Sequence, residues 1–235
     1  MTIRFRVLIF GLLIGCPASA PKDEHLKAAD ALFEKQDFKA AAGEYDLSLQ
    51  AHPSTDPELW KKGAFAFMKA GNYDKAAQLL LKTVELATTP AGKAEAYSNI
   101  AGMYLDPGNL PDKAEQYFGE VMKVDPKNEE ALNWLAEISS QLGGARQGIA
   151  APVPAQLDKA LARYDELLKL NPKRAEAWAN KRIAAVKYLQ ALSAKAPGTP
   201  SDPAELKAKT DQIQAVMNEC NQKLAEFAKG AAKPK

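Results

Sequence analysis

The sequence predicts an all-α protein built from repeated pairs of helices, and three observations support this prediction. Alanine makes up nearly a fifth of the 235 residues, and alanine has the highest helix propensity of all residues. β-branched residues, which favour strands, are scarce and scattered. The chain also aligns with itself at a period of about 34 residues, which is typical of stacked helical units.

The composition excludes several classes of protein. With 46% hydrophobic residues and two cysteines, the chain is too apolar for a disordered protein and too poor in cysteine for a disulfide scaffold. The 31 lysines and arginines are nearly balanced by 29 acidic residues. The net electric field is therefore weak, and we do not expect nucleic acid as a partner.

The first 20 residues have the form of a signal peptide. Arg4 and Arg6 precede an apolar run at residues 7–15, which is too short to cross a bilayer as a helix. We therefore expect an exported protein. Removing this leader also removes both arginines, which leaves the rest of the chain formally neutral.

Two cleavage sites are open. Residues 13–16, Leu-Ile-Gly-Cys, resemble the lipobox of bacterial lipoproteins. That resemblance implies cleavage before Cys16, a lipid on its thiol, and an anchor at the periplasmic face of a bacterial membrane, with the outer membrane favoured. Cleavage after Ala20 is the alternative, because residues 18–20 have the small-x-small form of an ordinary site. It would give a soluble periplasmic or secreted protein.

The first two repeat units place small and aromatic residues at the same intervals. Paired helices cross closely only where one offers a small side chain, so we expect Ala64 to lie near Ala76. Asp56 and Pro57 form a helix start, with a polar cap before a proline in the first turn. The aligned residues are Ala29, Leu32, Asp37, Phe38, Ala41, Tyr45, Ser48 and Pro53 in the first unit, and Trp60, Ala64, Phe67, Gly71, Tyr73, Ala76 and Leu80 in the second.

The third and fourth units keep this order but contain insertions. One extra residue within 106–111 lengthens a turn. About twelve extra residues at 144–155 predict a surface loop, which costs little additional entropy, or else a loop that contacts a partner. The aligned residues are Tyr97, Ile100, Ala101, Tyr104, Gly108, Ala114, Phe118 and Pro126 in the third unit, and Leu132, Leu135, Ala136, Gly143, Ala160, Tyr164 and Pro172 in the fourth.

Glycines and prolines mark the expected helix ends. We expect Gly71, Gly108 and Gly143 to adopt the left-handed conformation at the ends of the first helices. Three prolines, at positions 53, 126 and 172, follow the second helices.

The fifth unit begins well with Ala177 and Trp178 but then has Lys181 and Arg182, where the pattern requires Leu and a small residue. Its second helix is not found at the expected distance. A break rich in proline and glycine at residues 194–201 is followed by a capping box, which predicts a last helix over 202–229. This helix would cap the stack, and residues 230–235 would form a flexible tail.

Cys220 lies on the apolar face of this last helix together with residues such as Ile213 and Leu224. After removal of the leader it is the only thiol available for redox chemistry. We therefore expect it to be buried and inert.

The units resemble tetratricopeptide repeats over residues 22–190, as four hairpins and a weaker fifth. The resemblance implies an all-α, tetratricopeptide-type helical-hairpin solenoid with a C-terminal capping helix. It also implies that the first helix of each pair lines a concave groove that binds a segment of another protein. The groove residues implied by position are Lys61, Lys62, Phe65, Lys69, Ser98, Asn99, Asn133, Trp134, Glu137 and Asn180.

Some of these residues have a second interpretation. The three lysines could be solvated, and Trp134 could pack against the neighbouring repeat. Lys61 matches the first lysine of the carboxylate clamp found in some tetratricopeptide proteins, but Phe65 stands where the clamp has asparagine.

No motif indicates catalysis. The two histidines, His25 and His52, have no partner at a metal-ligand spacing. The sequence has no phosphate-binding glycine loop or nucleophile motif. We therefore expect no catalytic residue, no metal and no cofactor.

The sequence thus predicts a non-enzymatic adaptor of the bacterial cell envelope, which aids assembly or localisation of an envelope complex. Its expected partners are another envelope protein or peptide segment and, through the lipid, the membrane. One alternative is an envelope protein that handles cell-wall material or another substrate. Another is a structural repeat protein that self-assembles through the apolar face of its last helix.

Overall fold

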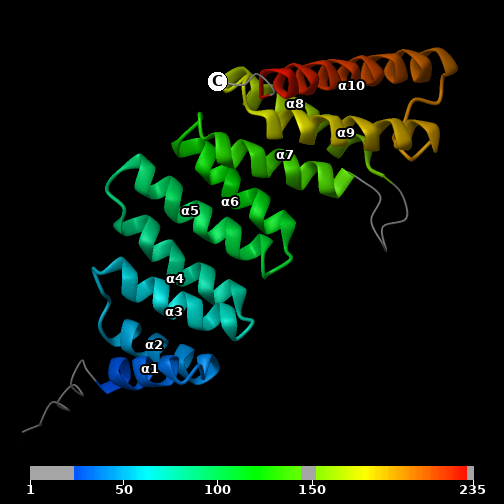
Figure 1. Ribbon diagram of the computed structural model, residues 1–235. Coiled ribbons are helices and arrows are strands. Elements are labelled where there is room, and N and C mark those ends of the chain that lie inside the picture. Colours follow the sequence, from blue (N-terminus) through cyan, green and yellow to red (C-terminus); the bar gives the residue numbers. More distant parts are fainter. Residues whose placement is uncertain (1–23, 144–151, 232–235) are drawn as a thin grey trace, which may run out of the picture.

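A computed structural model of the protein describes residues 24–143 and 152–231, and these residues form ten α-helices and no strand (Figure 1). The predicted signal peptide, lipidation of Cys16 and most of the 144–155 insertion lie outside the described residues. The helices are α1 (Glu24–Glu34), α2 (Phe38–Ala51), α3 (Pro57–Lys69), α4 (Tyr73–Leu86), α5 (Pro90–Leu105), α6 (Pro111–Val124), α7 (Glu129–Gly143), α8 (Pro154–Leu170), α9 (Ala175–Ser193) and α10 (Pro203–Ala231).

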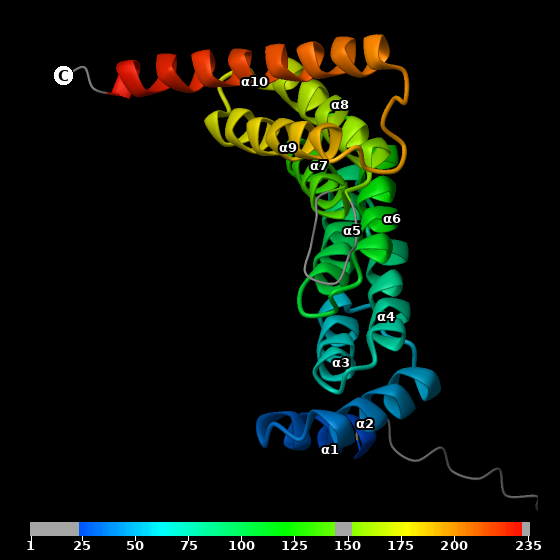
Figure 2. The same ribbon diagram turned by 90° about the vertical axis from the view of Figure 1, so that its right-hand side faces the viewer.

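The helices stack in chain order, and each packs against the helix before it and the helix after it. They form successive antiparallel hairpins, from α1/α2 at one end to α9/α10 at the other (Figures 1 and 2). This arrangement confirms the predicted all-α hairpin solenoid. We call α1, α3, α5, α7 and α9 the first helices of their pairs.

Alanines form the crossing points between paired helices. Ala64 is 2% exposed, and Ala76, Ala101 and Ala114 are fully buried. Aromatic rings such as Tyr104 and Phe118 fill the space beside them. The close approach that small side chains permit therefore occurs where the repeat pattern predicts it.

Helix starts follow the predicted caps. The Asp56 side chain accepts a hydrogen bond from the Glu58 backbone N–H at 2.9 Å, directly before Pro57. Asp202 accepts from the backbone N–H groups of Ala204 and Glu205, both at 2.9 Å, and opens α10. Each bond satisfies an N–H group that the first helical turn leaves unpaired.

The predicted role of the glycines was correct at one position of three. Gly71 has φ of +80°, as expected for a left-handed helix end. Gly108 and Gly143 do not have positive φ. A Cβ on Gly143 would lie 2.7 Å from Cγ of Leu157, so this glycine is required for the close approach of α8 to α7.

Two joints between hairpins contain the same three residue types, which we call the Asp–Tyr–Lys triads. In the first, Tyr104 of α5 donates to Asp74 of α4 at 2.9 Å, and Lys113 of α6 bonds the same carboxylate and lies over the Tyr104 ring. The second triad is Asp158 of α8, Tyr188 of α9 and Lys209 of α10, with bonds of 2.8 and 2.9 Å to the carboxylate. Lys209 lies 5.1 Å from the centroid of the Tyr188 ring.

Lys181 explains the departure of the fifth unit from the repeat pattern. Its Nζ lies 2.6 Å from Oδ1 of Asp165 on α8 and 3.5 Å from Oε2 of Glu219 on α10, and the residue is 3% exposed. Burial disfavours the charge, but these two carboxylates outweigh it and raise the pKa of Lys181. Lys181 stands where the pattern requires Leu, and its ammonium group joins α9 to both α8 and α10.

The capping helix α10 is the second helix of this last hairpin (Figure 2). Ile213 and Cys220 on its apolar face are buried, at 2% and 0% exposure, in the core cluster that also contains Trp178 and Tyr188 of α9. This face is therefore occupied within the chain, at the surface through which a second copy would have to pair.

None of the described helices is both long enough and apolar enough to cross a membrane.

Candidate functional site

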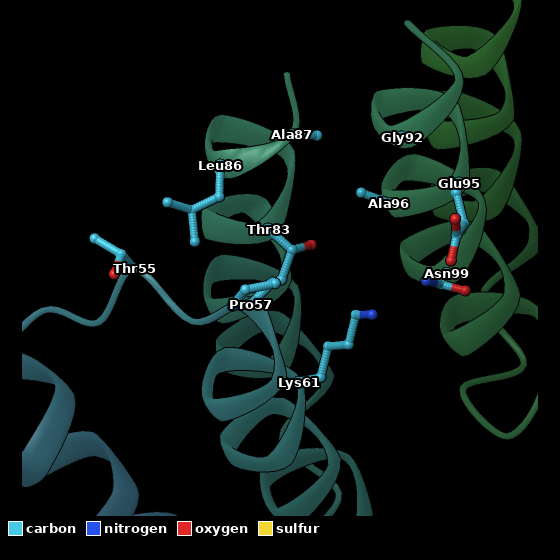
Figure 3. A pocket seen from close by; sticks show the side chains of 10 residues that line it. All are labelled: Thr55, Pro57, Lys61, Thr83, Leu86, Ala87, Gly92, Glu95, Ala96 and Asn99. Carbon is cyan, nitrogen blue, oxygen red and sulfur yellow. The ribbon is translucent and has the colours of Figure 1, made fainter. Parts of the chain in front are cut away.

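The furrow between α3 and α5 contains two adjoining cavities. The first has a volume of about 200 Å³ and is lined by polar groups that include Lys61, Glu95 and Asn99 (Figure 3). The second, of about 220 Å³, is lined by Phe65, Met68, Leu80 and Met103 together with Lys61 and Asn99. Because Lys61 and Asn99 belong to both linings, the two cavities form one continuous surface, which we call the α3–α5 furrow.

Polar groups face one another across this furrow. Figure 3 shows Lys61 of α3 directed toward Glu95 and Asn99 of α5. Lys61 Nζ donates to Oε1 of Glu58 at 2.8 Å, and this hydrogen bond raises the pKa of Lys61. Asn99 is exposed, and its amide can donate and accept hydrogen bonds at once. The furrow therefore combines a cation, a carboxylate and an amide beside an apolar hollow.

An aromatic cluster continues the apolar surface toward the first hairpin. Phe33, Phe38 and Phe65 contact one another, with ring centroids 5.4 to 5.6 Å apart. Phe65 remains 39% exposed, and Nζ of Lys69 lies 5.3 Å from the centroid of its ring. Beside this cluster, Lys62 pairs with Asp30 at 3.2 Å.

Trp134 lies on α7, the first helix of the next pair. Its ring stacks on Phe118 of α6, with centroids 6.1 Å apart and an interplanar angle of 10°. Trp134 is half-buried, so it packs against the preceding repeat and is only partly accessible to a partner.

A third cavity, of about 210 Å³, lies between α7 and α9. It is lined by Glu137, Ser140, Gln141, Tyr164, Asn180, Ile183 and Lys187. Tyr164 reaches it from α8, and the remaining residues belong to the two first helices. Nζ of Lys187 donates to the Ser140 carbonyl at 3.0 Å, and Glu137 accepts from Gln141 at 3.2 Å. Every lining side chain except Ile183 carries a polar group.

The largest of these cavities, about 440 Å³, lies on the opposite side, between α2 and α4. Leu49, Trp60 and Leu79 line it, and charged groups on its rim pair with one another, as in the 3.0 Å bridge from Lys75 to Asp46. None of the predicted groove residues lies here.

The structure separates the ten predicted groove residues into three groups. Three of them, Lys61, Phe65 and Asn99, come together in the α3–α5 furrow. Glu137 and Asn180 meet in the α7–α9 cavity. The remaining five line neither of these cavities: Lys62, Lys69, Ser98, Asn133 and Trp134.

Asn133 does not lie on an open surface as predicted. It is 4% exposed, and its Oδ1 atom is buried without a hydrogen-bond partner among the described residues. Helix α7 contacts α9 directly as well as α6 and α8. It therefore has less open surface than α3, and a position that carries Lys61 on α3 is enclosed on α7.

Sequence reasoning missed several lining residues. Met68 and Met103 lie three and four positions after Phe65 and Asn99 on the same helices, so helical spacing could have identified them. Tyr164 was interpreted only as a core aromatic residue, and it is indeed 1% exposed. Nothing in the sequence indicated that a cavity would reach it.

The described residues contain no group of three or more His, Cys, Asp or Glu side chains that could hold a metal ion. His25 hydrogen-bonds Glu44 at 2.7 Å on the surface. Cys220 is buried, and burial raises the pKa of its thiol to about 11. The site can therefore supply hydrogen bonds, charge and apolar contact.

No family model matches the sequence. Among solved structures, the chain is similar to a TPR repeats protein from Bacteroides fragilis, with 14% identity over 89% of this chain and 92% of that chain and a TM-score of 0.57. It is also similar to MamA protein, with 19% identity over 91% of this chain and 97% of that chain and a TM-score of 0.50. At these identities the similarity concerns the fold, which is that of a tetratricopeptide-type helical-hairpin solenoid.

Proposed function

We propose that this protein is a non-enzymatic adaptor of the bacterial cell envelope, which binds a segment of a partner protein on its first-helix face. Such binding would aid assembly or localisation of an envelope complex. One observation carries the proposal: Lys61 and Asn99 line both cavities of the α3–α5 furrow and so connect an apolar hollow with hydrogen-bonding groups.

This combination suits a polypeptide segment. An apolar side chain of the partner can enter beside Phe65, Met68 and Met103, where it removes apolar surface from water. Asn99 can hydrogen-bond the adjoining main chain as donor and acceptor. Methionine side chains adapt their shape to different partners. Two such first-helix cavities, one at α3–α5 and one at α7–α9, would let a single extended segment engage several hairpins.

The test is recovery of partners from an envelope extract with the tagged mature chain. A Phe65→Ala, Asn99→Ala double variant removes an apolar and a hydrogen-bonding contact, and we expect it to lose partners that the wild type retains. Leu47→Ala is the matched control, because Leu47 is 49% exposed on α2 and lines none of the first-helix cavities.

Helix content of both variants is checked by circular dichroism. Equal partner recovery by wild type and a folded double variant would contradict the assignment of the furrow.

We also propose that the protein is exported and held at the periplasmic face of a membrane by lipid on Cys16. The proposal is supported by the two arginines, the short apolar run and the Leu-Ile-Gly-Cys sequence at residues 13–16. Two or more acyl chains give stable attachment, whereas one chain alone is marginal.

Mass spectrometry of the mature N-terminus tests the anchor. We expect a lipid-modified Cys16 in wild-type cells, and loss of the protein from the membrane fraction after Cys16→Ala. An unmodified chain that begins at Pro21 would replace the anchor by soluble export.

A further inference from the structure

The α3–α5 and α7–α9 furrows correspond to each other residue by residue. The two Asp–Tyr–Lys triads establish the correspondence, because Tyr104 bonds Asp74 and Tyr188 bonds Asp158 at the same sequence separation of 30 residues. Met103 and Lys187 each directly precede the tyrosine of a triad. In the same way, Phe65 and Glu137 directly follow the small residue that recurs in the repeat pattern, which is alanine on both α3 and α7.

The corresponding positions have opposite chemistry. The apolar cavity of the α3–α5 furrow is lined by Phe65, Met68, Leu80 and Met103. In the α7–α9 cavity the same four positions carry Glu137, Ser140, Tyr164 and Lys187. The two cavities have similar volumes, about 220 and 210 Å³. The face therefore repeats one hollow in an apolar and a polar version, and the Trp134 stack lies between them.

Tyr164 has an unused hydrogen bond at the polar cavity. The residue is 1% exposed and lines the cavity, and the structure gives its hydroxyl no partner among the described residues. By contrast, Tyr45, Tyr104 and Tyr188 each donate to an aspartate. Burial, and then the negative charge of Glu137, raise the pKa of Tyr164, so the phenol stays protonated and able to donate.

The Tyr164 hydroxyl opens onto this cavity, where it can donate to an acceptor atom of a ligand. The lining holds both the carboxylate of Glu137 and the ammonium of Lys187, so a ligand group of either charge would meet a like charge, and an ammonium group also offers no acceptor. A primary amide is neutral and suits both residues. Its carbonyl oxygen can accept a hydrogen bond from the Tyr164 hydroxyl, and its N–H groups can donate to the Glu137 carboxylate.

We propose that the α7–α9 cavity binds a side-chain amide, from Asn or Gln of the partner segment, while the α3–α5 cavity binds an apolar side chain. This inference rests on the proposed function and specifies the direction in which the partner segment binds. The two unlike cavities fix which way the segment runs along the stack, with its apolar residue at α3–α5 and its amide at α7–α9.

Selection from a random displayed-peptide library against the immobilised mature chain tests this. We expect wild type to enrich peptides with a large apolar residue at one position and Asn or Gln at a second. A Tyr164→Leu, Lys187→Met variant installs the residues of the apolar counterpart. We expect it to lose the Asn or Gln enrichment while it keeps the first apolar position.

Affinity measurements with one selected peptide provide the second arm. Tyr164→Phe removes only the hydroxyl, so the fold should be retained, and we expect the affinity to fall about five- to tenfold for one lost hydrogen bond. The same variant should bind a Gln→Leu version of the peptide as wild type does. Phe65→Ala should weaken both peptides.

The outcomes separate the two proposals. Peptides that depend on Phe65 but show no amide preference and no response to Tyr164→Phe would overturn the polar subsite and leave the adaptor function standing. A library that yields no peptide dependent on Phe65 or Asn99 would overturn both.

Discussion

At the residue scale, polar side chains that are buried or partly buried connect neighbouring helices, both within a hairpin and between hairpins. Tyrosine hydroxyls donate to aspartates in three places, and Lys181 bonds carboxylates of the helices on both sides of it. Where two helices cross at alanines, the small side chains interlock little, so packing alone fixes the relative rotation of the helices only weakly. Hydrogen bonds between the helices fix this rotation, because a hydrogen bond weakens steeply when its angle changes.

The raised pKa values of four of the seven tyrosines predict how the free energy of unfolding changes at alkaline pH. Burial is the first cause that raises the pKa of Tyr45, Tyr104, Tyr164 and Tyr188, and bonds to aspartate add to it in all but Tyr164. In the unfolded chain tyrosine ionises near pH 10. A raised folded pKa favours the protonated phenol, so its stabilising effect is complete below about pH 10 and is lost as the pH rises further.

We therefore expect tyrosinate absorbance from these four residues to appear together with the loss of helical circular dichroism. Ionisation of all the tyrosines near pH 10 while the helix signal remains intact would contradict this coupling.

We expect the alkyl stem of Lys181 to contribute more to the free energy of unfolding than its charge does. Lys181→Ala removes a buried stem and should lower the free energy of unfolding by about 2–4 kcal/mol. Lys181→Met keeps the stem, and Asp165 and Glu219 are about half exposed and remain hydrated without the lysine. We expect a loss of about 1 kcal/mol or less.

Urea denaturation of both variants measures the difference. If the Met variant is as unstable as the Ala variant, then charge and not packing maintains this contact.

At the element scale, glycine serves two purposes: its positive φ ends one helix, and its missing Cβ permits another pair of helices to cross closely. The glycine of the α3 end supplies positive φ, whereas Gly143 of α7 supplies a missing Cβ. Both meet the expectation of a glycine at the end of a first helix. Only the packing of α8 against α7 distinguishes them.

Gly143→Ala should therefore destabilise the protein. The new Cβ would lie 2.7 Å from Cγ and 2.9 Å from the backbone N of Leu157, and overpacking of this kind costs about 1–3 kcal/mol. Gly119→Ala in α6 is the control, because nothing lies within 4 Å of the new Cβ. It should stabilise the helix by about 0.5–1 kcal/mol.

Thermal unfolding of the two variants gives shifts of opposite sign if this reasoning holds. Shifts of the same sign would show that the glycine at 143 is not kept for the α7–α8 crossing.

The helices could be predicted from sequence more completely than the site. Alanine and aromatic spacing, caps and prolines are local signals, and they located α1 to α8 and the start of α10. The site depends on how far apart successive first helices lie. Lys61 and Asn133 hold equivalent places in the repeat, yet α3 leaves the lysine half-exposed and α7 buries the asparagine. Helix α7 also contacts α9 directly and buries more of its residues than α3 does, and the spacing of residues along the chain does not reveal this difference in packing.

At the scale of the whole molecule, each hairpin contacts mainly its neighbours, so stability is distributed along the stack. The terminal helix α10 has one hairpin partner and a polar outer surface. Local opening at such an end requires less free energy than global unfolding. Cys220 is positioned to report it, because it is fully buried on the inner face of α10 in the described structure.

Thiol labelling of the mature chain carrying Cys16→Ser tests this behaviour. Burial raises the pKa of Cys220 to about 11, so native labelling near pH 8 should be slower than that of an exposed thiol by a factor on the order of 10³. At low urea the rate should follow the opening of α10. Lys181→Ala should increase it, because this change removes a contact between α9 and α10.

A labelling rate that follows global unfolding at every urea concentration would instead make the whole stack one cooperative unit.

The recurrence of the Asp–Tyr–Lys triads has a consequence for how the array can change in length. The helices between the two triads begin and end at joints that present the same side chains in the same order. Duplication or excision of a segment bounded in this way would keep the Asp–Tyr bond at the new joint. The joint of Lys181 sets a limit on such changes, because the position on α4 that corresponds to Asp165 carries Leu81.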